Sequence, residues 1–229
     1  MKMKFGAIVV DGRGKIGGHV ASKNRSGSYL RTKTTPVNPQ SSAQMAARSS
    51  LSTNSKGWAD LTDAQRNDWN NATELYSKTN IFGDKVLPTG KNLYTAINCN
   101  LALASVSAID SPLAPISVPA LSSLTLTADN SDQTLNLVFA ASPVPADTVY
   151  MVEATEGVSA GTAFVKSKYR KILVIPVFVP SPGDLAASYI AKFGSVPAAG
   201  KKIFVRVTAI SKTTGQRSTP LQTSCTVTA

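Results

Sequence analysis

The spacing of apolar residues changes along this chain and divides it into segments of different kinds. Between Asp11 and Gln44 the large apolar residues are only Ile16, Val20, Tyr29, Leu30 and Val37. So few side chains cannot bury enough surface to offset the entropy of ordering that length of backbone. The sequence therefore predicts that residues 1–35 form an extended, glycine-rich arm, which is disordered or is ordered by another surface.

Helical spacing begins after the proline break at Pro36–Pro39, because residues that precede proline avoid the α region. Thr62 and Gln65 fit a capping box at the start of a helix. We expect helices from Ser41 or Ser42 to about Ser52, over residues 62–77, and from a cap at Thr89 onward. Residues 36–104 would then form a small helical module with a core of Trp58, Trp69, Tyr76, Leu93 and Ile97. The two tryptophans could instead stack on bases or sugars, but their helical spacing favours packing.

A proline-spaced and nearly uncharged segment, residues 105–120, follows the helices and predicts a semi-rigid linker. From Leu121 the apolar residues alternate with a period of two. The expected strands are Leu124/Leu126, Leu135–Phe139, Tyr150–Ala154, Ile172–Val179, Ile203–Ala209 and Leu221–Val227. Pro176 places the fourth of these at a sheet edge or a bulge, and residues 184–193 are expected to hold a helical turn. Short strands separated by Pro and Gly predict an antiparallel β-sandwich of about seven strands over residues 121–229.

The terminal hairpin, Phe204–Ala209 with Gly215–Ser218, resembles the last two strands of a fibronectin type III domain. We expect the inward residues of the sandwich to include Leu126, Leu135, Leu137, Phe139, Val205 and Val207. The expected fold class is therefore α+β and multidomain. It comprises the extended basic arm, the small helical module and an all-β antiparallel sandwich of the fibronectin III or immunoglobulin-like kind.

Positive charge is concentrated at the start of the chain. The chain has 24 Lys and Arg against 13 Asp and Glu, and a net charge of +11. Within residues 1–50 the single acid is Asp11. We expect an assembly interface that faces acidic groups of a neighbouring chain, made by Lys2, Lys4, Arg13, Lys15, Lys23, Arg25, Tyr29, Arg31 and Lys33. Nucleic acid is a secondary alternative partner, because phosphate contacts need only such side chains.

Motifs for catalysis are weak. The segment Gly12–Gly17 matches G-x-G-x-x-G, but no apolar helix follows it, and the position that would bind a ribose falls among Lys33–Thr35. His19 is the only histidine, and it lacks the context of a nucleophile site. Cys99 and Cys225 are expected to be small core residues. We therefore expect no enzyme activity, no catalytic or metal-binding residues and no cofactor.

The first ten residues imitate a signal peptide, but Asp11 ends the short apolar run without a cleavage site. No stretch approaches the length of a membrane span. We therefore expect synthesis in the cytosol, no export by that route and no membrane partner.

Four segments in a fixed order carry a family resemblance over about residues 10–75. They are Gly14–Ser22, Arg25–Arg31, Asn38–Gln44 with Arg48, and then Trp58–Trp69. Together they resemble uncharacterised proteins of bacteriophages and their bacterial hosts with the layout GK-GG-V, R-G-Y-R, NP-x-x-x-AQ and W-x-x-LT-x-x-QR-x-x-W. Ser41 stands where those proteins often have Thr.

The resemblance implies a virion context, in which immunoglobulin-like domains are common additions to structural proteins. The expected function is a non-enzymatic structural component of a bacteriophage virion, of the decoration or minor capsid type. Its basic arm would bind capsid or connector subunits in a symmetric assembly, and its sandwich would be displayed. Two alternatives remain: a module of the tail or fibre that binds a host glycan or receptor, and a virion protein that binds packaged DNA.

Overall fold

The computed structural model describes residues 2–4, 12–140, 147–175 and 183–229. Its internal contacts divide the chain into two compact units, Met1–Thr95 and Ala96–Ala229. The boundary falls inside helix α3 (Gly90–Leu103), so the first turns of that helix belong to one unit and its later turns to the other.

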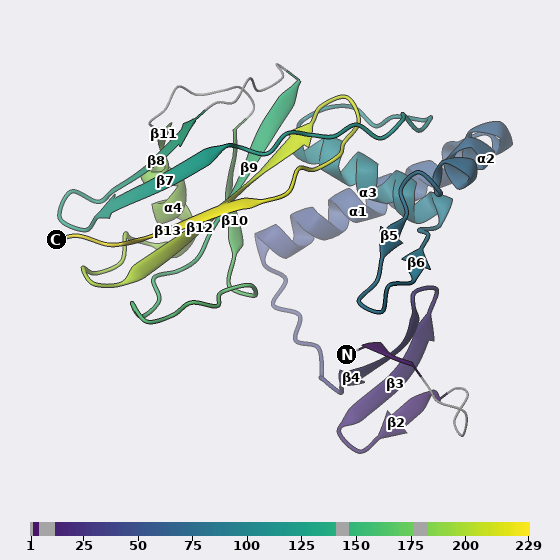
Figure 1. Cartoon of the computed structure of the whole chain (residues 1–229), viewed down its shortest axis with the longest axis horizontal. Helices are drawn as coiled ribbons and strands as arrows, with labels where there is room; N and C mark the ends of the chain where they lie inside the picture. The colour runs from purple at the N-terminus through teal and green to yellow at the C-terminus, as the bar shows by residue number, and fades with distance from the viewer. Residues whose placement is uncertain (1, 5–11, 141–146, 176–182) are drawn as a thin grey trace. The chain divides into compact units, whose positions relative to one another are not determined.

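The first unit begins with a small antiparallel sheet (Figure 1). Its strands are β1 (Lys2–Met3), β2 (Gly14–Ile16), β3 (His19–Asn24) and β4 (Gly27–Thr32), in the order β1-β4-β3-β2. Gly17 and Gly27 adopt positive φ angles of 57° and 104° beside the two tight turns, a conformation that glycine reaches without steric cost. The predicted extended arm is therefore wrong for residues 14–32, because these strands pair with one another and satisfy their backbone groups internally.

Two helices follow, α1 (Ser42–Asp60) and α2 (Asp63–Ala72). The side chain of Ser41 accepts a hydrogen bond from the Gln44 backbone N–H and caps α1. Thr62 and Gln65 form both bonds of the capping box that the sequence predicts. The helix bounds differ from the expectation, since α1 runs eight residues past Ser52 and α2 ends well before residue 77.

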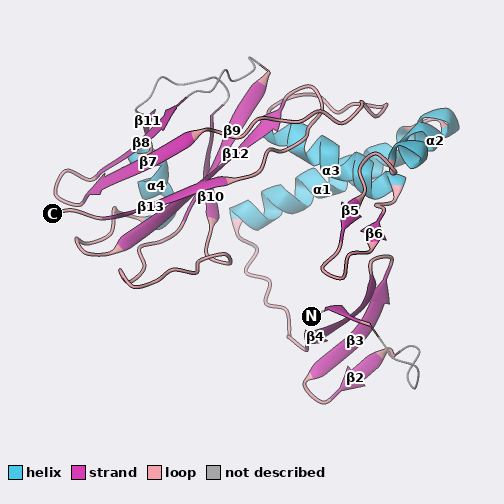
Figure 2. Ribbon diagram, in the orientation of Figure 1, coloured by secondary structure: helices cyan, strands magenta, loops and turns pink. Residues whose placement is uncertain are grey.

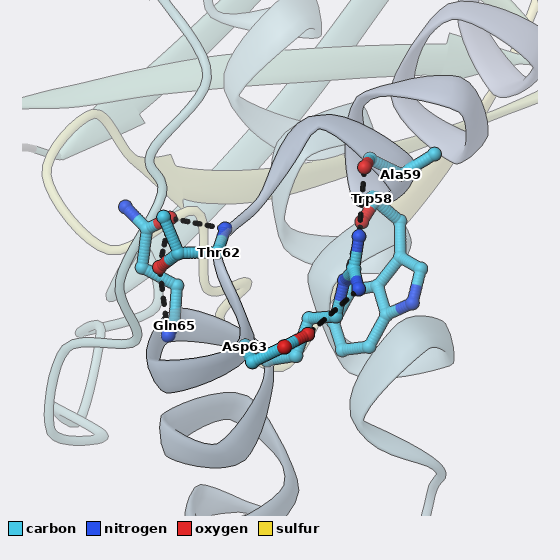
Figure 3. Close-up of polar contacts among 6 residues, drawn as sticks. Trp58, Ala59, Thr62, Asp63 and Gln65 are labelled. Carbon is cyan, nitrogen blue, oxygen red and sulfur yellow. Dashed lines mark hydrogen bonds and ion pairs between the residues drawn. The ribbon is translucent and has the colours of Figure 1, made fainter.

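The junction between α1 and α2 is stabilised by polar contacts to Trp58, Ala59 and Asp63, which Figure 3 draws as dashed lines. Arg66 donates to the carbonyl oxygens of Trp58 and Ala59, at 3.3 and 2.7 Å, and pairs with Asp63 at 3.0 Å. The last carbonyls of a helix have no partner within the helix. A cation at this end also interacts favourably with the helix dipole, so Arg66 satisfies the end of α1 while it belongs to α2.

A short hairpin, β5 (Lys78–Thr79) and β6 (Lys85–Val86), connects α2 to α3. The side chain of Thr89 accepts a hydrogen bond from the Asn92 backbone N–H at 3.2 Å, at the predicted start of α3. Tyr94 on α3 then receives two edge-on aromatic contacts, from Trp58 at 5.7 Å and from Trp69 at 5.4 Å between ring centroids. These rings form the centre of the helical part of the first unit.

The second unit is a sandwich of two antiparallel sheets, drawn as magenta strands in Figure 2. The four-stranded sheet has the order β10-β9-β12-β13, and the three-stranded sheet has the order β11-β8-β7. Their bounds are β7 (Ser123–Asp129), β8 (Thr134–Ala140), β9 (Thr148–Ala154), β10 (Arg170–Ile175), β11 (Gly183–Asp184), β12 (Lys202–Ser211) and β13 (Leu221–Thr226). One apolar core contains residues of both sheets. The described part of the chain thus has an α+β fold that contains a β-sandwich.

The sandwich core follows the alternation seen in the sequence. The six residues expected to point inward, Leu126, Leu135, Leu137, Phe139, Val205 and Val207, are all buried. Strand β10 lies at the edge of its sheet and has a register shift between Lys171 and Leu173. The rest of the predicted strand, residues 176–179, lies outside the described residues.

The predicted helical turn near residues 184–193 is helix α4 (Ala186–Phe193). It contributes Tyr189, whose side chain is fully buried and donates a hydrogen bond to the Thr155 carbonyl oxygen at 3.0 Å. Burial raises the pKa of this phenol far above its ordinary value. The bond satisfies the one polar atom that the ring carries into the core.

The predicted linker, residues 105–120, contains no helix or strand but is tied to the second unit. The side chain of Asn98 exchanges two hydrogen bonds with the backbone of Ile109. The Ile116 N–H donates to the Gln216 side chain at 3.0 Å. Ala104 packs in a cluster on the outer face of the four-stranded sheet with Val149, Met151 and Ile210. The boundary therefore lies at residues 95–96 and not at residue 104, because apolar contacts and hydrogen bonds hold residues 96–120 to the sandwich.

Candidate functional site

Strand register decides where the basic residues of the N-terminal sheet point. Lys2 lies opposite Tyr29. Lys15 lies opposite Val20, and Val20 opposite Arg31. Residues directly opposite in an antiparallel pair share a face of the sheet, and the face changes at each successive residue. Lys2, Lys15, Tyr29 and Arg31 therefore share one face, which we call the basic face.

The other face of this sheet is more apolar. It carries Ile16, Ala21 and Leu30, together with His19 and Lys23. Ala21 is buried and Leu30 is half-buried, but Ile16 is 67% exposed. The sheet is thus two-sided, with three cations on one face and a partly covered apolar surface on the other.

A small hollow lies at the hairpin end of the basic face. Its volume is about 210 Å³ and its lining includes Lys2, Tyr29 and Asn24. Asn24 also shapes the turn, because its side-chain oxygen accepts the Ser26 N–H at 2.9 Å. An ammonium beside a phenol and an amide can bind a carboxylate or another anionic group. This hairpin was not among the elements predicted from the sequence, although Asn24–Gly27 is a typical turn segment between two short alternating runs.

The remaining residues of the predicted interface are dispersed. Lys23 lies on the opposite face, Arg25 in the turn between β3 and β4, Arg13 before β2 and Lys33 after β4. Lys4 lies 3.0 Å from Asp84 and 5.5 Å above the centre of the Phe82 ring. Hydrogen bonds from Asn80 and then from Lys4 lower the pKa of Asp84. The expectation that Lys4 faces a partner chain is corrected, because this cation is paired within its own chain.

The residues predicted to form the core of the helical module differ in burial, and one of them belongs to the second unit. Trp69 is fully buried, Leu93 is buried, and Trp58 is half-buried. Tyr76 is only half-buried because α2 ends before it, so its position no longer follows the stripe of that helix. Ile97 is buried in the second unit, where its backbone and side chain approach Gly215.

The described residues offer no obvious centre for chemistry. Among them, no group of three or more His, Cys, Asp or Glu side chains could hold a metal ion. His19 is exposed on its strand. Neither Cys99 nor Cys225 forms a disulfide within the described residues. Burial raises the pKa of the Cys225 thiol to about 11. Within the described ranges, no helix has both the length and the hydropathy needed to cross a bilayer.

Taken together, the second unit defines a protein that carries an antiparallel β-sandwich, and the first unit adds a basic sheet and a helical part. No family model matches the chain, and no curated protein matches it. The solved structures that are similar include an Fn3-like protein from Clostridium thermocellum, at 20% identity and a TM-score of 0.32. That alignment covers 49% of this chain and 97% of the other. The bacteriophage resemblance therefore rests on the sequence segments alone.

Proposed function

We propose that this protein is a non-enzymatic structural component of a bacteriophage virion, of the decoration or minor capsid type. In this proposal the basic face binds an acidic surface of a capsid or connector subunit. The sandwich is displayed from the particle. The protein would be made in the host cytoplasm and would reside in the virion as one of several symmetric copies.

The alignment of Lys2, Lys15 and Arg31 beside Tyr29 is the observation that carries this proposal. Each exposed ion pair contributes only about 0–1 kcal/mol. Several cations on one face can act together. Tyrosine is also enriched in protein interfaces, and Tyr29 lies half-buried beside these cations. Because the sheet holds the three cations on one face, a partner can contact all three at once, which the charges of a flexible tail would not allow.

Two further features of the sheet support an anchoring role. Among the described residues, β2 pairs only with β3, so its outer edge can extend a sheet of a neighbouring chain. The apolar side is incompletely covered, since Ile16 is 67% exposed. A partner that covers Ile16 would add apolar burial to the charge contacts, at roughly 25 cal/mol per Å².

The strand order of the second unit supports an immunoglobulin-like displayed domain of the fibronectin III kind. With the seven described strands lettered A to G in chain order, the sheets group A, B and E against C, F and G. These are the groupings of the immunoglobulin fold. The fourth strand, β10, pairs with the third strand instead of the fifth.

The proposal is tested on particles purified from the bacterial culture that carries the gene. Quantitative mass spectrometry of gradient-banded particles should find the chain at a fixed copy number that matches the symmetry of the particle. The variant Lys2→Glu/Lys15→Glu/Arg31→Glu reverses the charge of the basic face. Its incorporation should fall at least about tenfold, because three contacts are lost together.

A matched control reverses the same number of charges on exposed lysines of the sandwich, Lys168→Glu/Lys171→Glu/Lys192→Glu, and should be incorporated normally. Circular dichroism of both purified variants checks that they are folded. Equal incorporation of the two variants would show that the basic face is not the anchor. Absence of the unmodified chain from the particles would refute the virion function itself.

A further inference from the structure

The sandwich carries a second hollow, separate from the basic face. Its volume is about 520 Å³, within the range of roughly 300–1,000 Å³ that is typical of small-molecule sites. It lies on the outer side of β12 and β13, beside the connection formed by residues 155–169. Its lining includes Phe164, Lys166, Tyr169, Phe204, Arg206 and Gln222.

The alternation of β12 builds the floor of this hollow. Ile203, Val205 and Val207 point into the core, so Phe204 and Arg206 point outward. The register places Arg206 opposite Gln222 of β13, so the two side chains lie on the same face. The floor is thus formed by regular strands, which hold side chains more rigidly than loops do.

The wall of the hollow comes from a connection that is longer than the fold requires. A hairpin between β9 and β10 needs only about 2–5 residues, whereas residues 155–169 separate these strands. Val158, Val165 and Tyr169 of this connection form a small apolar cluster with Phe204. The connection is therefore packed in place, and it holds Phe164 and Lys166 at the rim.

Arg206 is fixed in position before any ligand arrives. Its Nε and Nη2 atoms donate to one carboxylate oxygen of Glu153, at 2.8 and 2.6 Å. Its guanidinium carbon lies 4.5 Å from the centre of the Tyr169 ring, a cation–π distance. The third nitrogen, Nη1, makes no hydrogen bond within the described residues, so it can donate to a ligand without a change of rotamer.

Other polar groups at the hollow can also donate, among them the hydroxyl of Ser224, which can accept as well. The Gln222 side-chain oxygen accepts from the Tyr169 hydroxyl at 3.4 Å, which leaves the amide nitrogen of Gln222 to donate. Lys166 is exposed and has no ion pair among the described residues. Since Glu153 balances Arg206, the positive charge that remains is that of Lys166 at the rim and of Lys202, whose ammonium lies 5.0 Å from the centre of the Phe204 ring. This set of groups favours a ligand with many acceptors and a negative charge.

The apolar groups add a requirement for a flat, weakly polar surface. Phe164 is 78% exposed at the rim, and Phe204 lies in the floor. A sugar ring presents one face of C–H groups that can lie on an aromatic ring, while its hydroxyls accept hydrogen bonds at the edge. We propose that this hollow binds an acidic saccharide, with the ring against Phe164 and Phe204 and the carboxylate at Lys166 and Arg206. The inference does not depend on the virion function.

The test is a titration of the full chain, by calorimetry and by amide chemical shifts in NMR spectra. The acidic probes are trigalacturonate and a hyaluronan tetrasaccharide, and the neutral probe is the methyl ester of trigalacturonate. At least one acidic probe should bind at concentrations up to about 10 mM, the range of weak single-site binding. The methyl ester should bind at least about fivefold more weakly than the acid, because it lacks the charge.

Two variants probe the two halves of the site, and two more serve as controls. Phe164→Ala should weaken binding about tenfold through loss of the aromatic surface, and Lys166→Gln about fivefold through loss of the charge. Ile116→Ala and Lys192→Gln alter an exposed apolar residue and an exposed lysine elsewhere on the same unit. Both controls should bind like the unmodified chain, and shifted amides should cluster in β12 and β13.

Three results would overturn the inference. The first is the absence of binding by both acidic probes at the highest concentration. The second is equal affinity of the Phe164→Ala and Lys166→Gln variants and the unmodified chain. The third is tighter binding of a thymidine oligonucleotide at the same amides, which would assign the aromatic surface to nucleic acid.

Discussion

Gly215 lies where the turn between β12 and β13 meets α3, and replacing it with alanine tests how closely these elements pack. Its φ angle is +64°. A Cβ atom there would lie 2.7 Å from the Ile97 carbonyl oxygen and 3.1 Å from Cγ of Leu101. Asn100 bonds the Gly215 carbonyl oxygen at 2.7 Å, so the turn cannot retreat without breaking this bond. The turn and the helix must therefore separate to admit a methyl group.

The cost of Gly215→Ala has two parts. A left-handed conformation costs a non-glycine residue roughly 1–2 kcal/mol, and overpacking against a fixed backbone costs a further 1–3 kcal/mol or so. We expect the free energy of unfolding to fall by about 2–5 kcal/mol. Gly200→Ala is the matched control, because Gly200 also has a positive φ, +82°, but nothing lies within 4 Å of the position that a Cβ atom would take there. The Gly200→Ala variant should therefore lose only the cost of the left-handed conformation, about 1–2 kcal/mol.

Urea unfolding of each variant, followed by far-ultraviolet circular dichroism, measures the two free energies. Amide hydrogen exchange in β12 reports the same loss locally. The variant Gly215→Ala should lose about 1–3 kcal/mol more than Gly200→Ala, which is the overpacking part alone. Equal losses in the two variants would refute the close contact between this turn and α3.

Two further predictions concern the buried Trp69 ring of the first unit and the partly buried Cys225 thiol of the second. Trp69→Ala should lower the free energy of unfolding by about 3–5 kcal/mol, whereas Leu75→Ala, at a 63% exposed position, should change it by less than about 0.5 kcal/mol; similar urea midpoints would contradict the packing of Trp69. Burial raises the pKa of Cys225 from 9.0 to about 11, so peptide mapping at pH 8 should show alkylation about 100-fold slower in the folded chain than in urea. Because the thiol ionises first in the unfolded chain, stability should fall as the pH rises from about 9 to about 11; equal alkylation rates would show that the thiol is accessible.

The candidate sites were only partly visible in the sequence. The basic residues near the N-terminus stood out by composition, but their division between two faces depends on which strands pair and in which register. Lys4 could not be distinguished from the other basic residues, because its partner Asp84 lies 80 residues further along the chain, in the hairpin of β5 and β6. The hollow on the sandwich has no signature in the sequence, because Phe164 and Phe204 are far apart in the chain and line one hollow only when the β9–β10 connection folds back over β12.

The sequence by itself determined the elements whose signals are local. The caps at Ser41, Thr62 and Thr89 involve side chains that reach backbone groups three residues away. The alternation of strands such as Ile203–Ala209 likewise records burial of one face over a few neighbouring positions. Each of these patterns lies within a short stretch of sequence, so it can be recognised without knowledge of the fold.

Only the tertiary structure determined the features that depend on contacts between distant segments, such as strand pairing and the unit to which a residue belongs. It paired Lys2 with Tyr29 and so turned an expected arm into a sheet. It also assigned Ile97 to the sandwich unit, through a turn at Gly215 that lies more than a hundred residues further along the chain. Local composition cannot specify such pairings, because the free energy of a contact depends on which residues it joins. Those partners are brought together only when the whole chain folds and its loops close.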